Sequence, residues 1–382
     1  MKQKNVPRLT STLIALVIPG VFSLAPRVLM AADATASSTP AVPSWTDTLA
    51  AWGISANGYV AASYYASNGY PTNIHQFDVD HDTFQLDQAG LQLAYQPKSG
   101  FGAVVDVIAG EDAKIVDAAE SAGASDNSFD ILQGFVQYVT GPLTVQAGKF
   151  TTLAGAEVIA PTGNTNFSRS LLFFAEPMTH TGVRATYALS GTLSVIVGVN
   201  NGWNYTKIDS GSKTGELGIS LTPDKYFSLT AQLYAGKDPV YGAQRTFFDT
   251  VATFNATSAL SFVVSYDWGK QQATAATPSF LTGGDWDGVA GYVNYQLSGQ
   301  WRVSLRAEYL DDKDGTTLVT GARQRLTEGT VTLGYDPVAS FELRLEGRYD
   351  SSSEPTFLES ETPVAEYGSN QREVALQGVY KF

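Results

Sequence analysis

The sequence of 382 residues predicts an all-β fold, a transmembrane antiparallel β-barrel of about 16 strands. Three observations lead to this prediction. Segments in which apolar and polar residues alternate recur along most of the chain, and this period of two is typical of β-strands. Short and long connections alternate between these segments. Charged residues make up only 16% and aromatic residues 12% of the chain, whereas roughly a quarter of an ordinary soluble domain is charged.

The composition also excludes several classes of protein. No cysteine is present, which excludes a disulfide scaffold, thiolate metal sites and a cysteine nucleophile. The net charge of −13 argues against a nucleic-acid partner, since such proteins are usually basic. The many aromatic and β-branched residues argue against disorder. Beyond the N-terminal segment, the sequence lacks the apolar run of about 18 residues that a transmembrane helix needs.

The first 32 residues resemble a targeting segment. Basic residues come first, an uncharged stretch with apolar residues 13–18 follows, and the small residues Ala31 and Ala32 suit signal peptidase. Two prolines and a glycine interrupt the apolar stretch, so we favour a cleaved signal peptide over a membrane anchor. Residues 33–44 are small, polar and proline-bearing, and we expect a flexible lead-in there. Residues 45–382 are then the barrel.

The clearest strand pattern covers residues 341–349. Its apolar face consists of Phe341, Leu343, Leu345, Gly347 and Tyr349, and its charged face of Glu342, Arg344, Glu346 and Arg348. In a soluble sandwich the apolar face would form a core, whereas in an outer-membrane barrel it would face lipid and the charged face a wet lumen. Alternation alone leaves both readings open. Aromatic residues end many such stripes, as expected for girdles at two membrane interfaces.

The connections favour the membrane barrel. Short turns are predicted at 97–100, 140–142, 190–192, 222–225, 256–258, 298–300 and 336–339. Longer loops are predicted at 67–82, 112–127, 153–178, 203–212, 237–243, 270–284, 312–322 and 352–369. Seven short turns and eight longer loops give 16 strands, and outer-membrane barrels combine an even strand number with this asymmetry of loop length.

The C-terminus gives an independent indication of location. Apolar residues alternate from Val374 to the final Phe382. A terminal aromatic residue after an alternating strand is a sorting feature shared by many bacterial outer-membrane proteins. We therefore predict that the chain lies in the bacterial outer membrane, with its lipid as a partner.

From about Trp45 to Phe382 the sequence resembles the OmpL-like β-barrel porin family. The resemblance rests on Gly148-Lys149-Phe150, Glu157-Val158-Ile159, residues 166–173, Thr179 to Arg184, residues 199–203 and residues 213–217. It implies a 16-stranded outer-membrane porin, a water-filled channel that passes small hydrophilic solutes or ions by passive diffusion. The constriction-loop signature of the general trimeric porins has no obvious counterpart here, which leaves monomer and homo-oligomer open.

Residues 153–178 form the third long loop, and in porin-like barrels this loop folds into the lumen and narrows it. It carries Glu157, Arg169 and Glu176, and His180 and Arg184 follow on the inward face of the next strand. A narrow lumen lined by charge filters ions by field and by size. We therefore predict that these five residues form the constriction. In the alternative reading, the charges pair with one another, hold the loop down and contact no solute.

A basic wall is a second pore-lining prediction. Arg302 and Arg306 share one strand face, and Arg344 and Arg348 share another two strands later. Glutamates are interleaved with them, so we favour a cross-strand ladder of opposite charges that stiffens the barrel.

Other chemistry finds little support in the sequence. The acidic run around Asp78, Asp80 and Asp82 offers oxygen ligands for Ca²⁺, but such loops are usually only solvated, and we predict no metal, cofactor or catalytic residue. The chain has three histidines and no Gly-x-Ser-x-Gly element. Two alternatives to a porin are a surface-binding barrel (adhesin or receptor) with a closed lumen, and an outer-membrane hydrolase that uses His180 with Ser168 or Glu176.

Overall fold

The computed structural model describes residues 45–70, 74–121, 127–276, 283–360 and 365–382. The predicted signal peptide (1–32) and lead-in (33–44) lie outside these described residues. A short helix, α1 (Trp45–Ala51), precedes the first strand, so the barrel itself begins at Ile54. Among the described residues, no helix has the length and apolar character needed to cross a membrane.

Strands account for most of the chain. Those of the first half are β1 (Ile54–Ser67), β2 (Thr83–Tyr95), β3 (Gly100–Ala109), β4 (Phe129–Thr140), β5 (Leu143–Thr151), β6 (Thr179–Ala188), β7 (Leu193–Asn200), β8 (Thr214–Leu221) and β9 (Phe227–Lys237). Those of the second half are β10 (Gln244–Asn255), β11 (Leu260–Gln272), β12 (Gly283–Gln296), β13 (Trp301–Asp312), β14 (Gln324–Val338), β15 (Phe341–Ser352), β16 (Phe357–Ser360), β17 (Glu366–Gly368) and β18 (Asn370–Lys381).

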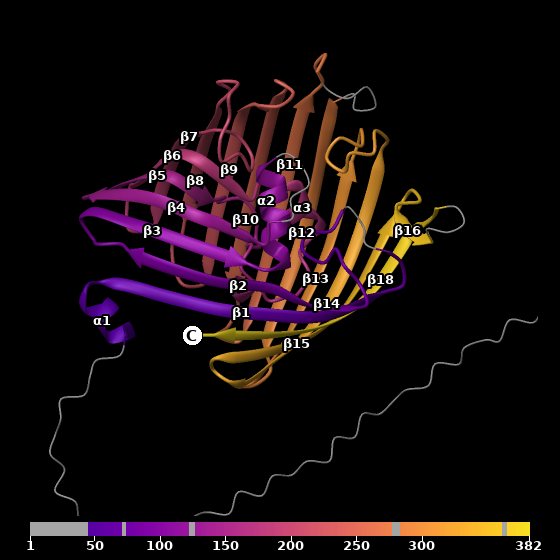
Figure 1. Cartoon of the computed structure of the whole chain (residues 1–382), viewed down its shortest axis with the longest axis horizontal. Helices are drawn as coiled ribbons and strands as arrows, with labels where there is room; N and C mark the ends of the chain where they lie inside the picture. The colour runs from indigo at the N-terminus through magenta and orange to yellow at the C-terminus, as the bar shows by residue number, and fades with distance from the viewer. Residues whose placement is uncertain (1–44, 71–73, 122–126, 277–282, 361–364) are drawn as a thin grey trace, which may run out of the picture. The chain divides into compact units, whose positions relative to one another are not determined.

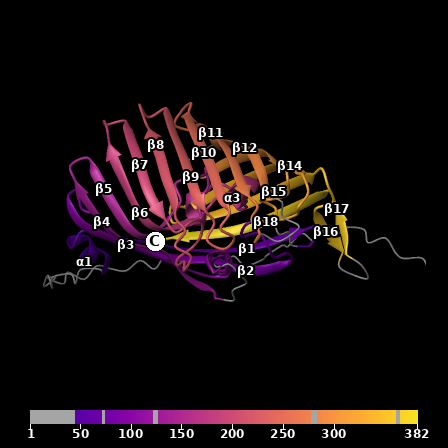
Figure 2. The same ribbon diagram turned by 90° about the horizontal axis from the view of Figure 1, so that it is seen from above.

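Sixteen of these strands form one closed antiparallel barrel (Figures 1 and 2). Each strand pairs with its neighbours in sequence, and β1 pairs with β18 to close the ring. Only β16 and β17 lie outside it, as a separate two-stranded hairpin within the last long connection. The predicted fold class and strand number are thereby confirmed.

The two faces of each strand are inverted relative to a soluble protein. On β15, Leu345 is 51% and Tyr349 44% exposed, whereas Arg344 is 1% and Glu346 3% exposed. A soluble sandwich would bury the leucine and expose the arginine, because an unpaired buried charge costs several kcal/mol. An outward apolar face and an inward charged face are the arrangement of a membrane barrel. Of the two readings that alternation left open, the structure therefore supports the membrane barrel and not the soluble sandwich.

Aromatic residues gather where the short turns join the strands. The exposed members of this set are Tyr95, Phe101, Tyr138, Tyr187, Tyr226, Phe254, Tyr295, Trp301 and Tyr380. Some pack against each other across strands, as do Phe101 with Tyr138 and Trp301 with Tyr335. Rings at this level suit the membrane–water interface, where an apolar body and a polar tip are both accommodated.

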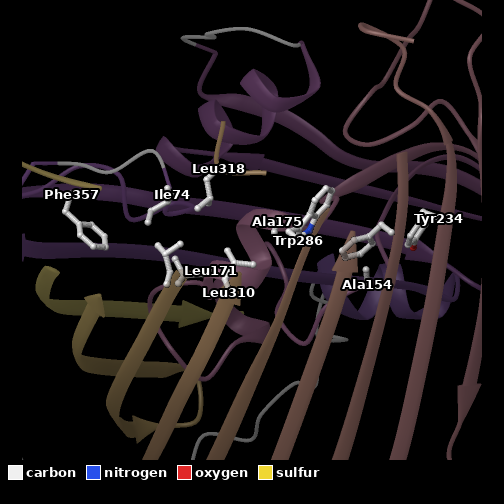
Figure 3. Packing of buried hydrophobic residues seen from close by; sticks show 11 residues of the cluster. Ile74, Ala154, Leu171, Ala175, Tyr234, Trp286, Leu310, Leu318 and Phe357 are labelled. Carbon is white, nitrogen blue, oxygen red and sulfur yellow. The ribbon is translucent and has the colours of Figure 1, made fainter. Parts of the chain in front are cut away.

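The long connections have structure of their own. They contain α2 (Glu111–Glu120), a single turn η1 (Pro161–Gly163) and α3 (Leu171–Ala175). The largest apolar cluster forms where these connections meet inward strand residues: Ile74, Leu171 and Leu318 come from connections, and Trp286 and Leu310 from strands (Figure 3). The main core is therefore inside the ring of strands, and it fixes the connections to the wall.

Candidate constriction site

Six of the charged residues on the inward faces of β13 and β15 bind the third long connection, and we call them the charged wall: Arg302, Arg306, Glu308, Arg344, Glu346 and Arg348. Its four arginines all donate to backbone carbonyls of residues 161–169. The Nη1 atom of Arg306 is 2.8 Å from the Ser168 carbonyl oxygen, and that of Arg348 is 2.8 Å from the Arg169 carbonyl oxygen. The predicted basic wall is thus occupied by a segment of the third long connection.

The glutamates of the charged wall accept from the same segment. Glu346 accepts the N–H groups of Phe167 at 2.6 Å and Ser168 at 2.9 Å. Glu308 accepts those of Leu171 at 2.8 Å and Leu172 at 3.2 Å. Hydrogen bonds to ionised groups are roughly twice as strong as neutral ones. Residues 161–172 are therefore bound to the wall through both their carbonyls and their amides.

Ion pairs complete the same surface. Arg306 pairs with Glu157 of the connection at 2.9 Å and with Glu328 of the adjacent β14 at 3.1 Å. Glu342 pairs with Arg302 and Arg344. The wall therefore contains a ladder of opposite charges and also anchors the connection.

Arg169 lies on the connection but turns back onto it. Its guanidinium donates to the carbonyl oxygens of Val158, Ile159 and Phe167 at 2.7–2.9 Å. It also lies over the ring of Phe77. Burial lowers the pKa of Arg169 from its ordinary value. These contacts hold the loop in shape, and every N–H group they use is directed at backbone rather than at open space.

His180 and Arg184 both face inward from β6, as predicted from their spacing. Arg184 binds Glu216 at 2.9 Å and lies 4.1 Å above the ring of Phe150. His180 stacks on Tyr234 with ring centroids 4.7 Å apart. The five predicted constriction residues thus divide among separate groups: Glu157 with Arg306, Arg169 with its own loop, and His180 and Arg184 with β8 and β9.

Glu176, the fifth residue, belongs to a buried acidic cluster. Its carboxylate lies with those of Asp249 on β10 and Asp267 on β11, and one oxygen of each lies within 4.8 Å of the others. Burial, and then the charge of Asp249, raise the pKa of Glu176 well above its ordinary value. Sequence reasoning missed both aspartates. The sequence signal that could have identified them is their position on the polar faces of two adjacent strands.

A second buried cluster surrounds His75 in the first long connection. The Nδ1 atom of His75 is 3.1 Å from Asp78 and 3.4 Å from Glu373, and its Nε2 atom is 3.5 Å from Asp350. Burial and Arg348 oppose a charge on His75, but these carboxylates outweigh them and raise its pKa well above the ordinary value. Arg348 pairs with Asp78 and Asp350. Two cationic side chains thus already balance these acids, and a metal ion fits here poorly.

The acidic run that offered ligands for Ca²⁺ does not converge on one point. Asp78 is buried in the His75 cluster, whereas Asp80 and Asp82 are exposed. Asp82 contacts the neighbouring His81 at 2.8 Å.

Two cavities adjoin the third long connection. One of about 300 Å³ lies near the long loops and is lined by Glu176, Trp203 and Trp286, among others. The other, of about 360 Å³, is lined by β2–β5 residues such as Asp106 and by the connection from Thr151 to Ala160. Glu176 packs against the backbone of Gly155, which lines this second cavity. The carboxylate of Glu176 thus lies where the two cavities approach each other.

Solved structures show the same architecture. The outer-membrane channel DcaP of Acinetobacter baumannii matches with a TM-score of 0.59 and 14% identity, covering 86% of this chain and 97% of that chain. An anion-selective porin from Comamonas acidovorans matches with a TM-score of 0.59 and 12% identity, covering 86% and 99%. OmpT of Vibrio cholerae matches with a TM-score of 0.58 and 12% identity, covering 86% and 97%. At these identities the likeness establishes the fold.

Sequence comparison establishes the family. No curated protein matches the chain. The family described as "Putative beta-barrel porin-2, OmpL-like" matches residues 53–382, which include all the strands of the barrel. The chain therefore belongs to the OmpL-like β-barrel porin family of the outer membrane.

Proposed function

We propose that the protein passes small hydrophilic solutes or ions by passive diffusion, through a lumen that residues 153–178 narrow. The observation that supports this most strongly is the attachment of this connection to the charged wall. The connection joins β5 to β6, whereas β13 and β15 lie on the far side of the closed strand order. A segment bound at both places has to cross the interior of the barrel. No covalent chemistry is required, so the protein is not an enzyme in this proposal.

The charges that remain for a solute are mainly acidic. Most donors of the charged-wall arginines and of Arg169 are engaged by backbone and carboxylates, and the Nε atom of Arg344 is a buried donor with no described partner. The acidic cluster has no ion-pair partner among the described residues, and its member Glu176 lies between the two cavities. We therefore propose that solutes pass beside Glu176 and that the channel prefers cations over anions, because a charged constriction attracts counter-ions.

Planar-bilayer recording tests this proposal. The mature protein should give discrete conductance steps in KCl, with a reversal potential of the sign for cations under a salt gradient. In recordings at alkaline pH, where Glu176 has lost its proton despite its raised pKa, Glu176→Gln should move the reversal potential toward zero, because it removes one carboxylate from the path. Glu366→Gln, at an exposed site on the β17 hairpin, is the matched control and should not. An absence of steps would reject the channel and favour the surface-binding barrel with a closed lumen.

Export and assembly are parts of the same proposal. We infer that residues 1–32 are cleaved during export, with the barrel inserted in the outer membrane as its family indicates. Homo-oligomerisation is compatible with the exposed apolar belt, which either lipid or a second copy can cover. N-terminal sequencing of protein isolated from outer membranes tests the cleavage, which should leave Asp33 or Ala32 as the first residue.

A further inference from the structure

Asp249 and Asp267 are directly opposite each other on the paired strands β10 and β11. Like charges in this position destabilise a sheet. Two other acids on the inner wall, Glu308 and Glu328, also face each other, but Arg306 pairs with both of them. The pair of Asp249 and Asp267 has no such basic partner among the described residues, and the connection adds a third carboxyl group, that of Glu176.

The oxygens of this cluster lack the partners that buried carboxylates require. Asp267 is fully buried, and its oxygens have no hydrogen-bond partner among the described residues except the carboxyl groups of Asp249 and Glu176. One oxygen of Asp249, also fully buried, has no described hydrogen-bond donor, and the carboxylate otherwise contacts the hydroxyl of Ser265 at 3.5 Å and the backbone N–H of Gly155. Buried polar groups are normally paired, and a buried charge costs much more unless it is compensated. The unpartnered oxygens point to a missing cation.

The spacing of the three carboxylates suits one divalent ion. Ca²⁺ takes oxygen ligands at about 2.3–2.6 Å, so two ligands on opposite sides of the ion lie about 4.8 Å apart. One oxygen from each of Glu176, Asp249 and Asp267 falls within 4.8 Å of the others. All three can therefore contact the same ion. Water from the cavity of about 300 Å³ that Glu176 lines can supply the remaining ligands.

We propose that Glu176, Asp249 and Asp267 bind a divalent cation of the Ca²⁺ type between the third long connection and the wall of β10 and β11. The ion joins two strand carboxylates to the end of the connection that precedes β6. This inference concerns binding alone and does not depend on whether the barrel conducts. A failure to bind calcium would therefore reject this inference alone, and an absence of conductance would reject the channel proposal alone.

The alternative is a cluster that shares protons and has no ion. Ca²⁺ binds the deprotonated form of a carboxyl group, so a true site should gain affinity as the pH rises. A cluster that only shares protons has no saturable affinity for Ca²⁺ at any pH.

The test measures ⁴⁵Ca²⁺ binding by the purified full-length mature protein in detergent, with Tb³⁺ emission excited through Trp286 as a second readout. Trp286 lines the same cavity as Glu176, so bound Tb³⁺ should be sensitised. We expect one Ca²⁺ per chain, with a dissociation constant of about 10⁻⁵ to 10⁻³ M. Asp249→Asn and Asp267→Asn should weaken binding at least tenfold, and so should Glu176→Gln.

Asp106→Asn is the matched control. Asp106 is also buried on the inner wall, but it accepts hydrogen bonds from Gln92 and Gln133 at 3.1 Å. This variant should bind Ca²⁺ like the wild type. Far-UV circular dichroism verifies that each variant retains the barrel. The proposal is overturned if the wild type shows no saturable binding, or if the cluster variants bind as tightly as Asp106→Asn.

Discussion

Buried arginines on the inner wall bind mainly to backbone. The Nη1 atom of Arg348 donates to the carbonyl of Arg169, and Arg169 in turn donates to three carbonyls of its own loop. A guanidinium has five N–H donors in a fixed plane, so it can satisfy several carbonyls that would otherwise be buried without partners. These arginines therefore serve the structure of the connection at least as much as any solute.

His75 gives a prediction at the scale of a single residue. Its raised pKa means that it is protonated in the folded protein at neutral pH, where it balances Asp78, Asp350 and Glu373. Removing one partner of a buried charge network costs about 3–5 kcal/mol. His75→Gln should therefore lower the free energy of unfolding by about this amount at pH 6, measured by urea unfolding with tryptophan fluorescence.

The pH dependence of this effect has a defined sign. A group whose pKa is raised on folding stabilises fully below its unfolded pKa, about 6.5 for histidine. That stabilisation is lost as pH rises through the folded value, so the difference between wild type and His75→Gln should shrink at alkaline pH. His81→Gln is the control, because His81 lies on the same connection but pairs with a single, exposed acid, Asp82, besides its ring contact with Tyr70. A difference that grows with pH would contradict the charged state of His75.

At the scale of elements, the strands were predictable and the connections were not. Alternation over residues 341–349 identifies β15 because each strand gives one face to lipid and one to the interior. The helices α2 and α3 and the β16–β17 hairpin lie in segments that the sequence predicted only as long loops. Their form depends on contacts with distant strands, such as Glu308 with the first amides of α3. No local pattern records such partners.

In the candidate site, too, the strand residues could be predicted from the sequence, whereas the contacts of the connection could not. The inward direction of His180 and Arg184 follows from strand periodicity, and the structure has both side chains buried on the inner wall. The assembly of Glu176 with Asp249 and Asp267 joins three distant parts of the chain. This assembly could not be predicted from the sequence, because the sequence does not show which strands the connection contacts.

The docked connection gives a prediction for this element. Glu346→Gln should release residues 165–168 from the wall, because it removes the charge that holds the amides of Phe167 and Ser168. Each hydrogen bond to a charged group contributes about 1.5–3 kcal/mol. Trypsin should then cleave after Arg169 at least tenfold faster than in the wild type, as measured by mass spectrometry of the folded protein.

Glu366→Gln serves as the control for this experiment, because Glu366 is exposed on the β17 hairpin, outside the barrel. It should leave the cleavage rate after Arg169 unchanged. The open segment should also make the channel noisier and raise its conductance. Equal protection of Arg169 in wild type and Glu346→Gln would mean that the contacts of Arg302, Arg306 and Arg344 suffice to hold the connection.

At the scale of the whole molecule, the barrel depends on joining its two ends. A sheet with an open edge exposes unpaired N–H and C=O groups, and only closure removes them within a membrane. Strands β1 and β18 make this closure. The last residue takes part: Gly58 and Phe382 exchange two backbone hydrogen bonds of 2.9 Å each. The alternating C-terminal strand is thus the piece that completes the ring.

Gly58 allows this closure because it has no side chain. A Cβ atom at this position would overlap the ring of Phe382. Gly58→Ala should therefore displace the ring and cost about 1–3 kcal/mol, as overpacking usually does. Gly329→Ala is the control, since a Cβ added on Gly329 meets open space. The measurement is the thermal midpoint of the refolded barrel, followed by circular dichroism.

A double-mutant cycle separates ring displacement from a general loss of strand pairing. If the overlap with Phe382 is the cause, Gly58→Ala should cost little in a Phe382→Ala background, because the ring is then absent. The coupling energy should reach about 0.5–3 kcal/mol, as for residues in direct contact. Additive effects of the two substitutions would show that Gly58 acts through β1 alone. Closure would then depend on the strand ladder, with no specific contribution from the terminal aromatic ring.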